Sequence, residues 1–229
     1  MSKRKRQRST SRPGYIYDTE HVDVEDIEIP NFERWYHFYG SLFAALHSVY
    51  EGSDAIRTDG NELIPSNPAI VHHFLSAVKA DERYGHKSVF YEMGCGVGNN
   101  LLIASWLGFD VQGNEIDKKR VEFAKRVLKE CEIEPKIFVG RHENIIYPRG
   151  PKVISYLYPY DVTDLPKTVS RLQIGQHIII YQDHEQLTME MDRLGFCPAL
   201  SKAYHVSDMK GEPLALYVCL YERVRQLHG

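Results

Sequence analysis

The chain has 229 residues, of which 43% are hydrophobic and 26% are charged, as in an ordinary globular protein with a sizeable core. Its net charge is −3, so the body as a whole is not built to coat nucleic acid. No apolar run approaches the ~20 residues of a membrane span, and no signal peptide opens the chain. The four cysteines, Cys95, Cys131, Cys197 and Cys219, form no Cys-x-x-Cys pair. We therefore expect an intracellular protein without a metal site, a disulfide framework or a membrane partner.

The first 30 residues differ in composition from the rest. A basic, serine-rich cluster at 3–12 is followed by an acidic patch at 18–28. Such a segment cannot bury enough apolar surface to offset its ordering entropy, so we expect 1–30 to be disordered. The basic cluster indicates a nuclear address or a phosphate-binding arm, with a solvated tail as the alternative. The expected location is the nucleus or the cytoplasm, with the nucleus slightly favoured.

Residues 31–65 are expected to form a helical extension followed by a loop. Aromatic and leucine side chains recur at three- and four-residue spacing from Phe32 to Tyr50, and Asn31 is a suitable N-cap. This helix would either cover a ligand pocket or pack on a sheet.

From residue 66 to the end, strand-like and helix-like segments alternate. The expected strands are 88–93, 109–114, 136–139, 153–157, 176–181, 196–205 and 214–221, and the expected helices are 68–80, 99–107, 118–130 and 185–194, with a short helix capped by Asp164. Ser66 or Asn67 would cap the first helix, with Pro68 near its first turn, and its His72 and His73 are expected at the surface. Its buried face would consist of Ile70, Val71, Phe74, Leu75 and Val78, and the helix at 118–130 would turn its apolar residues inward and its charges outward. Alternating units imply a parallel sheet with helices on both faces, and the last two strands imply an antiparallel hairpin. The predicted fold class is α/β: a Rossmann-like, doubly wound, seven-stranded sheet that is mostly parallel.

The chain is organised around 89–100, where an apolar strand runs into Gly94, Gly96 and Gly98 and then into a helix. In such a unit, backbone N–H groups and a helix N-terminus face a ligand, and glycines allow it to approach the main chain. The next strand ends in Glu115, near the ~20-residue offset expected of a carboxylate that accepts both hydroxyls of a ribose. This order of features predicts a nucleoside-cofactor site.

The variant of the glycine motif narrows the cofactor. Nicotinamide and flavin proteins favour Gly-x-Gly-x-x-Gly, whereas this chain has Glu-x-Gly-x-Gly-x-Gly beginning at Glu92. The pattern resembles motif I of the class I S-adenosylmethionine-dependent methyltransferases, and the strand order over 66–223 fits the same class. The resemblance implies S-adenosyl-L-methionine as cofactor, with Glu92 near its amino-acid moiety, the loop at Cys95 beneath it and Glu115 on its ribose. The alternative is a strand–turn–helix without a ligand.

The remaining cofactor contacts follow from the same resemblance. The segment after the third strand contacts the adenine in these proteins, and His142 and Glu143 are favoured here over Arg141 and Asn144. A surface loop is the alternative for His142. The expected cofactor-binding set is Glu92, Gly94, Cys95, Gly96, Gly98, Glu115, Ile116, His142, Glu143 and Tyr156.

The segment after the fourth strand meets the methyl acceptor in these enzymes. It carries Tyr156, Tyr158, Tyr160 and Asp161. Aromatic faces favour a cation, either the sulfonium or an approaching ammonium, although Tyr156 could instead point into the core. A lysine acceptor must also lose a proton. Tyr158, Tyr160 and Asp161 are therefore the catalytic candidates that would orient the lysine or relay its proton.

Two narrower resemblances concern protein-lysine enzymes. The motif at 90–99 with 113–116 resembles the disruptor-of-telomeric-silencing type of histone lysine methyltransferase, and 153–181 resembles the lysine methyltransferases that modify ATP synthase subunit c. Methyltransferases of adenine or glutamine carry Asp/Asn-Pro-Pro-Tyr where this chain has Leu157-Tyr158-Pro159-Tyr160. The resemblance implies lysine methylation of a protein substrate. The alternatives are an RNA or DNA methyltransferase, whose substrate the basic arm would contact, and a non-catalytic cofactor-binding subunit of a methyltransferase complex.

Overall fold

The computed structural model describes residues 20–22, 66–87, 89–141, 144, 147–159, 163, 165–207 and 213–225. Several predictions lie outside these residues and stay predictions: the basic cluster, the aromatic helix within 31–65, and the site residues His142, Glu143, Tyr160 and Asp161.

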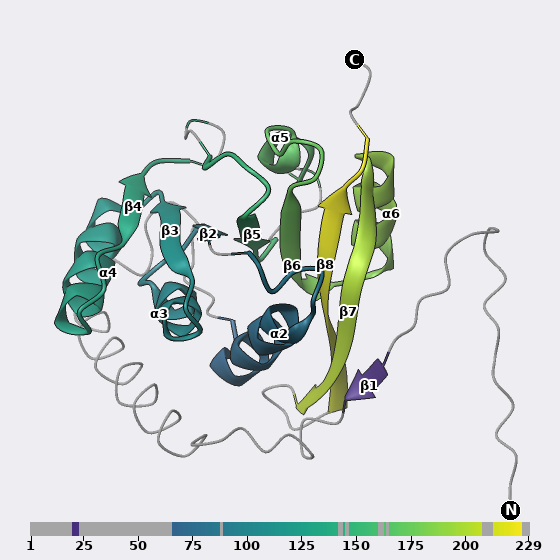
Figure 1. The fold of residues 1–229 in the computed structure, drawn as a ribbon, viewed down its shortest axis with the longest axis horizontal. Helices are drawn as coiled ribbons and strands as arrows, with labels where there is room; N and C mark the ends of the chain where they lie inside the picture. The colour runs from purple at the N-terminus through teal and green to yellow at the C-terminus, as the bar shows by residue number, and fades with distance from the viewer. Residues whose placement is uncertain are drawn as a thin grey trace, which may run out of the picture.

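Strands and helices alternate along the chain as predicted (Figure 1). The strands are β1 (Glu20–Val22), β2 (Val89–Met93), β3 (Asp110–Glu115), β4 (Lys136–Val139), β5 (Val153–Leu157), β6 (His177–Asp183), β7 (Phe196–Ser207) and β8 (Pro213–Arg223). The helices are α2 (Pro68–Ala80), α3 (Asn99–Trp106), α4 (Lys118–Glu130), α5 (Leu165–Val169) and α6 (Glu185–Arg193).

All described strands lie in one eight-stranded sheet in the order β1-β7-β8-β6-β5-β2-β3-β4. β2, β3, β4, β5 and β6 are parallel to one another, whereas β8 is antiparallel to both β6 and β7. β2 pairs with β3 on one side and with β5 on the other, so the strand order reverses there. Ligands of open α/β sheets bind outside the carboxyl ends of the strands at such a reversal.

The two faces of the sheet are covered by different helices. On one face, α2, α3 and α4 pack on alternate strand residues such as Phe90 and Ile154. On the other face, α5 and α6 pack on their neighbours, for example Tyr91 and Val153. Because successive strand residues point to opposite faces, each central strand is apolar on both sides, as a doubly wound sheet requires.

The start of α2 confirms the predicted cap. The Asn67 side chain accepts a hydrogen bond of 3.0 Å from the N–H of Ala69, and Pro68 occupies the first turn, where its missing N–H costs nothing. The predicted buried face is also confirmed: Ile70, Val71, Phe74, Leu75 and Val78. His73, predicted on the surface, is instead half-buried, and its Nδ1 lies 2.8 Å from the hydroxyl of Tyr204.

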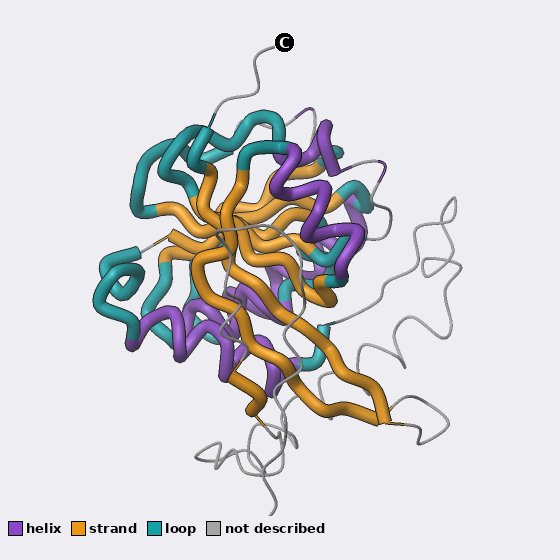
Figure 2. The backbone as a smooth tube through the Cα atoms, turned by 90° about the vertical axis from the view of Figure 1, so that its right-hand side faces the viewer, coloured by secondary structure: helices purple, strands orange, loops and turns teal. Residues whose placement is uncertain are grey.

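The two C-terminal strands form the predicted antiparallel hairpin, which extends well beyond the neighbouring strands (Figure 2). Its outer strand also pairs with β1, in register from Glu20 opposite Lys202 to Val22 opposite Tyr204. The seven predicted strands are therefore joined by an eighth, and the prediction of disorder is wrong for these three residues. An edge strand offers unpaired N–H and C=O groups to any extended segment, so pairing needs no apolar pattern in the partner.

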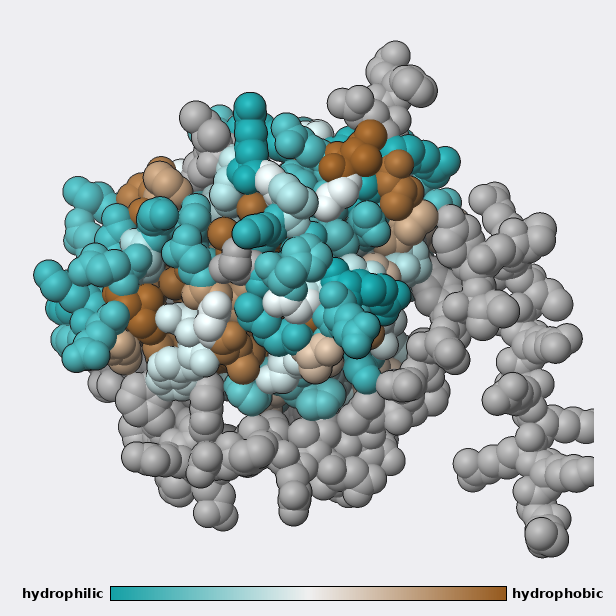
Figure 3. All heavy atoms as spheres, in the orientation of Figure 1, coloured by the Kyte–Doolittle hydropathy of each residue, from teal (hydrophilic) through white to brown (hydrophobic). Residues whose placement is uncertain are grey.

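The face of the molecule in Figure 3 is mostly hydrophilic, with small separate apolar areas. Among the described residues, no helix is long and apolar enough to cross a membrane.

Candidate functional site

The glycine loop leaves β2 and enters α3 at the point where the strand order reverses. Gly94, Gly96 and Gly98 have φ values of 75°, 53° and 87°, in the left-handed region that favours glycine. Gly98 is the N-cap of α3 and packs against α4: a Cβ there would lie 3.3 Å from Cβ of Ala124 and 3.2 Å from Cδ1 of Leu128. Glycine is therefore favoured here for two separate reasons. All three residues have a positive φ, and at Gly98 a side chain would also collide with α4.

Three N–H groups of the loop are bonded within the protein. Cys95 donates to the carbonyl of Asn114, Gly98 donates to that of Cys95, and Gly96 donates to the carboxylate of Glu115. The expectation that these N–H groups face a ligand is thus wrong for these three. A pyrophosphate is bound by free N–H groups at such a loop, and these three are not available to it.

Glu115, at the carboxyl end of β3, is 4% exposed. Its Oε2 accepts from the N–H of Gly96 at 2.9 Å, and its Oε1 accepts from the N–H of Asp117 at 2.9 Å. The guanidinium of Arg120, equally buried, lies 3.7 Å from Oε1. A carboxylate has about four acceptor positions, so a carboxylate held in this way can still accept from two ribose hydroxyls.

Glu92 in β2 is the second buried carboxyl of the site and is 4% exposed. Its Oε1 accepts from Nδ2 of Asn100 at 2.6 Å. Among the described residues, its Oε2 has no hydrogen-bond partner. Burial raises the pKa of Glu92 to about 8, the bond from Asn100 opposes this shift, and the nearby charge of Glu115 adds to it.

Tyrosines from β5 and β6 meet the start of α2. The hydroxyl of Tyr156 lies 2.5 Å from Oγ of Ser66, and the hydroxyl of Tyr181 accepts from the N–H of Asn67 at 2.9 Å. Tyr158, just beyond β5, packs edge-on to Tyr181 with the ring centroids 5.0 Å apart. Burial raises the pKa of Tyr181 to about 12, so the phenol of Tyr181 stays uncharged near neutral pH.

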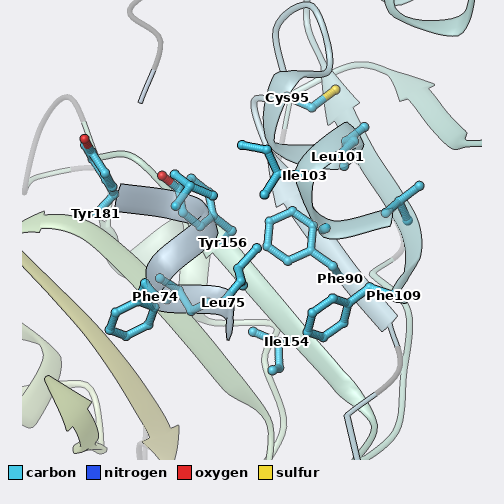
Figure 4. Packing of buried hydrophobic residues seen from close by; sticks show 14 of the residues in the cluster. Phe74, Leu75, Phe90, Cys95, Leu101, Ile103, Phe109, Ile154, Tyr156 and Tyr181 are labelled. Atoms are coloured by element: carbon cyan, nitrogen blue, oxygen red, sulfur yellow. The ribbon is translucent and has the colours of Figure 1, made fainter. Parts of the chain in front are cut away.

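The described members of the predicted site fall into two groups. The first group consists of the glycine loop, Glu92 and Glu115. Gly96 is hydrogen-bonded to Glu115, and the charges of the two carboxylates are close enough to repel. Ile116 follows Glu115 and is 39% exposed, which leaves its side chain accessible to a ligand. The ring of Tyr156 lies in the core against Phe90 (Figure 4), so a direct contact with a cofactor stays a prediction.

Three polar residues of the site were missed in the sequence: Ser66, Asn100 and Arg120. Ser66 was considered only as a helix cap, and Arg120 only as one of the outward charges of its helix. A signal for Asn100 was present, because Asn99 and Asn100 open a helix that is otherwise apolar through Ala104. Polar residues buried in an apolar helix are rare unless they have partners.

The order of strands, the helices on each face and the carboxylate-bearing glycine loop together define the fold of the class I methyltransferases. No protein-family model matches the chain, and no curated protein matches its sequence.

Three solved structures with this fold are similar to the chain. Magnesium protoporphyrin IX methyltransferase from Synechocystis, with bound S-adenosylmethionine, has a TM-score of 0.55 and 15% identity over 80% of this chain and 96% of its own. An RNA methyltransferase from Salinibacter ruber, in complex with S-adenosyl-L-homocysteine, has a TM-score of 0.52 and 19% identity over 72% and 96%. Geranyl diphosphate methyltransferase, in complex with geranyl diphosphate and sinefungin, has a TM-score of 0.51 and 15% identity over 68% of this chain and 78% of its own. At such identities the likeness shows the fold, and the three enzymes are named for acceptors of different classes.

Proposed function

We propose that this chain is an S-adenosyl-L-methionine-dependent methyltransferase that acts on a protein lysine. The cofactor assignment rests on the hydrogen bond from the N–H of Gly96 to Oε2 of Glu115, which holds a buried carboxylate beside the glycine loop. A ribose diol binds such a carboxylate through two charge-assisted hydrogen bonds. The three similar structures contain S-adenosylmethionine, S-adenosylhomocysteine or sinefungin, which supports the same cofactor here.

The described residues fit this cofactor. Its amino-acid end carries an ammonium, and Glu92 offers a buried oxygen that has no partner among the described residues. Its ribose is suited to Glu115, and its adenine to the accessible Ile116. The cofactor would supply an electrophilic methyl group, and the protein would orient the acceptor in line with it and exclude water.

The tyrosines beyond β5 support an ammonium-bearing acceptor. Tyr158 is half-buried against Tyr181, in the segment that directly follows a strand paired with β2. Aromatic faces attract an ammonium, and the chain lacks the Asp/Asn-Pro-Pro-Tyr pattern of enzymes that methylate planar amines. In this proposal Tyr158, Tyr160 and Asp161 orient the lysine or relay its proton, and the expected location is the nucleus or the cytoplasm, with the nucleus slightly favoured.

An RNA acceptor is the second candidate. The basic cluster at 3–12 could contact phosphates, and one of the similar structures is an RNA methyltransferase. The whole chain has a net charge of −3 although it includes the basic cluster, so the remainder of the chain is negatively charged. That remainder has no general attraction for a polyanion, which favours the protein acceptor.

The deciding experiment is transfer of a radiolabelled methyl group from S-adenosylmethionine to a cell extract, separated into protein and nucleic-acid fractions. Gly96→Val is the control, because a side chain at this position should block the approach of the cofactor to the glycine loop. The proposal expects label in a protein band that survives nuclease and is identified as methyl-lysine by mass spectrometry. Label in RNA would support the second candidate instead. Cofactor binding without label in either fraction would identify a non-catalytic subunit.

A further inference from the structure

Two buried acceptor atoms without a partner in the part of the chain that the structure describes belong to side chains that are eight residues apart in sequence and hydrogen-bonded to each other. Among the described residues, neither Oε2 of Glu92 nor Oδ1 of Asn100 has a hydrogen-bond partner, although the two side chains are 4% and 5% exposed. The other atoms of both groups are joined, since Nδ2 of Asn100 donates to Oε1 of Glu92 at 2.6 Å. Leaving a buried polar atom unsatisfied costs about 1–3 kcal/mol, so two at one place indicate a ligand that satisfies them.

The pair is held by groups that do not belong to the glycine loop. Asn100 Nδ2 lies 3.5 Å from Oγ of Ser66, and Ser66 lies 2.5 Å from the hydroxyl of Tyr156. These contacts connect α3, the start of α2 and β5. Asn100 is therefore restrained from two sides, and its carbonyl oxygen has a defined position relative to Glu92.

The chemistry of the two atoms selects the ligand. Both are oxygens that accept, so the ligand must donate. The titratable groups that face Glu92 are Glu115 from β3, Cys95 from the loop and Tyr156 from β5, and none of them is a cation. The guanidinium of Arg120 lies beside Glu115 instead, 3.7 Å from its Oε1. Two acceptor atoms with no cation among the groups that face Glu92 are suited to an ammonium and disfavour a carboxylate.

We propose that Asn100 and Glu92 together bind the α-ammonium of the cofactor, with Asn100 holding Glu92 through Nδ2 and accepting from the ammonium through Oδ1. The proposal rests on the proposed function and adds to it a binding residue that lies outside the glycine motif. Because burial raises the pKa of Glu92 to about 8, an ammonium that binds at pH 7 displaces the carboxyl proton, which goes to the solvent. Binding of the cofactor thus releases about one proton at pH 7.

The experiment compares three ligands by isothermal titration calorimetry on the full chain. S-adenosylhomocysteine carries the ammonium, its deamino analogue lacks only that group, and 5′-methylthioadenosine lacks the whole amino-acid end. We expect the wild-type protein to bind S-adenosylhomocysteine about tenfold or more tightly than the deamino analogue. Titrations at pH 7 in two buffers of different ionisation enthalpy should show proton release with S-adenosylhomocysteine and none with 5′-methylthioadenosine.

The matched variant is Asn100→Leu, which keeps the approximate shape and removes both polar atoms. It should bind S-adenosylhomocysteine about tenfold more weakly and 5′-methylthioadenosine within twofold of wild type. A loss for both ligands would show a structural role for Asn100 and overturn the proposal. If the variant does not fold, equal wild-type affinity for S-adenosylhomocysteine and its deamino analogue would overturn it. Failure of the wild-type protein to bind any of the three ligands would instead contradict the proposed function.

Discussion

The N–H of Gly96 donates a hydrogen bond of 2.9 Å to Oε2 of Glu115, across 19 residues of sequence. The glycine loop and the end of β3 therefore form one unit, and the ribose site does not depend on either segment alone. The same bond explains why the loop can spare no N–H at this position for a phosphate.

Glu115→Ala should weaken binding of S-adenosylhomocysteine by about 1.5–3 kcal/mol, because it removes the charge-assisted bonds to the ribose. Calorimetry measures this loss, and deoxyribose analogues should lose less. Glu122→Ala is the control, since Glu122 is an exposed carboxylate on α4 that lies 3.6 Å from Lys118 and belongs to no site. Unchanged affinity of the Glu115 variant would remove Glu115 from the cofactor site.

Gly98→Ala should destabilise the fold more than Gly108→Ala, although both glycines have a positive φ, 87° and 80°. A Cβ at Gly98 meets Ala124 and Leu128 of α4, whereas a Cβ at Gly108 has no heavy atom within 4 Å. Backbone strain of about 1–2 kcal/mol is common to both variants, and overpacking adds about 1 kcal/mol or more at Gly98. Urea unfolding compares the two, and equal losses would mean that α4 moves aside freely.

Glu92→Gln should stabilise the empty protein and weaken cofactor binding. Burial raises the pKa of Glu92 from its ordinary value near 4.5 to about 8 in the fold. Between these values the folded state holds one more proton than the unfolded state, so the free energy of unfolding falls as the pH rises. Glutamine does not titrate, and it can still accept the bond from Asn100.

The stabilisation by Glu92→Gln should therefore be about 1 kcal/mol at pH 5 and about 3–4 kcal/mol at pH 7 to 8. Urea unfolding at both pH values without cofactor measures it. A gain that is the same at pH 5 and pH 8 would show that Glu92 is ionised in the empty site.

Tyr158→Ala should lower kcat/KM for the protein acceptor about tenfold, because an aromatic face contributes about 1–2 kcal/mol to binding an ammonium. Tyr158→Phe should keep most of the activity if the ring is what matters. Cofactor affinity, measured by calorimetry, should be unchanged in both. If Tyr158→Phe is as inactive as Tyr158→Ala, the hydroxyl and not the ring carries the role.

The local pattern of the chain was sufficient for most of the fold. α2 illustrates this: Asn67, Pro68 and an apolar residue every three or four positions specify a cap, a first turn and a buried face without reference to any other element. β4 and β5 begin and end where the sequence predicts. β1 was not predictable, because its three residues pair through the backbone with an edge that lies far along the chain.

The fold class, the glycine loop and the two carboxylates could be predicted from the sequence, because each depends on residue types at short and regular spacing. The hydrogen bonds that join these groups could not: Gly96 to Glu115, Asn100 to Glu92, and Ser66 to Tyr156 across 90 residues. Such contacts depend on which strands are neighbours and which helix covers them. A hydrogen bond forms only within about 3 Å, and the packing of the whole sheet decides which distant side chains approach that closely.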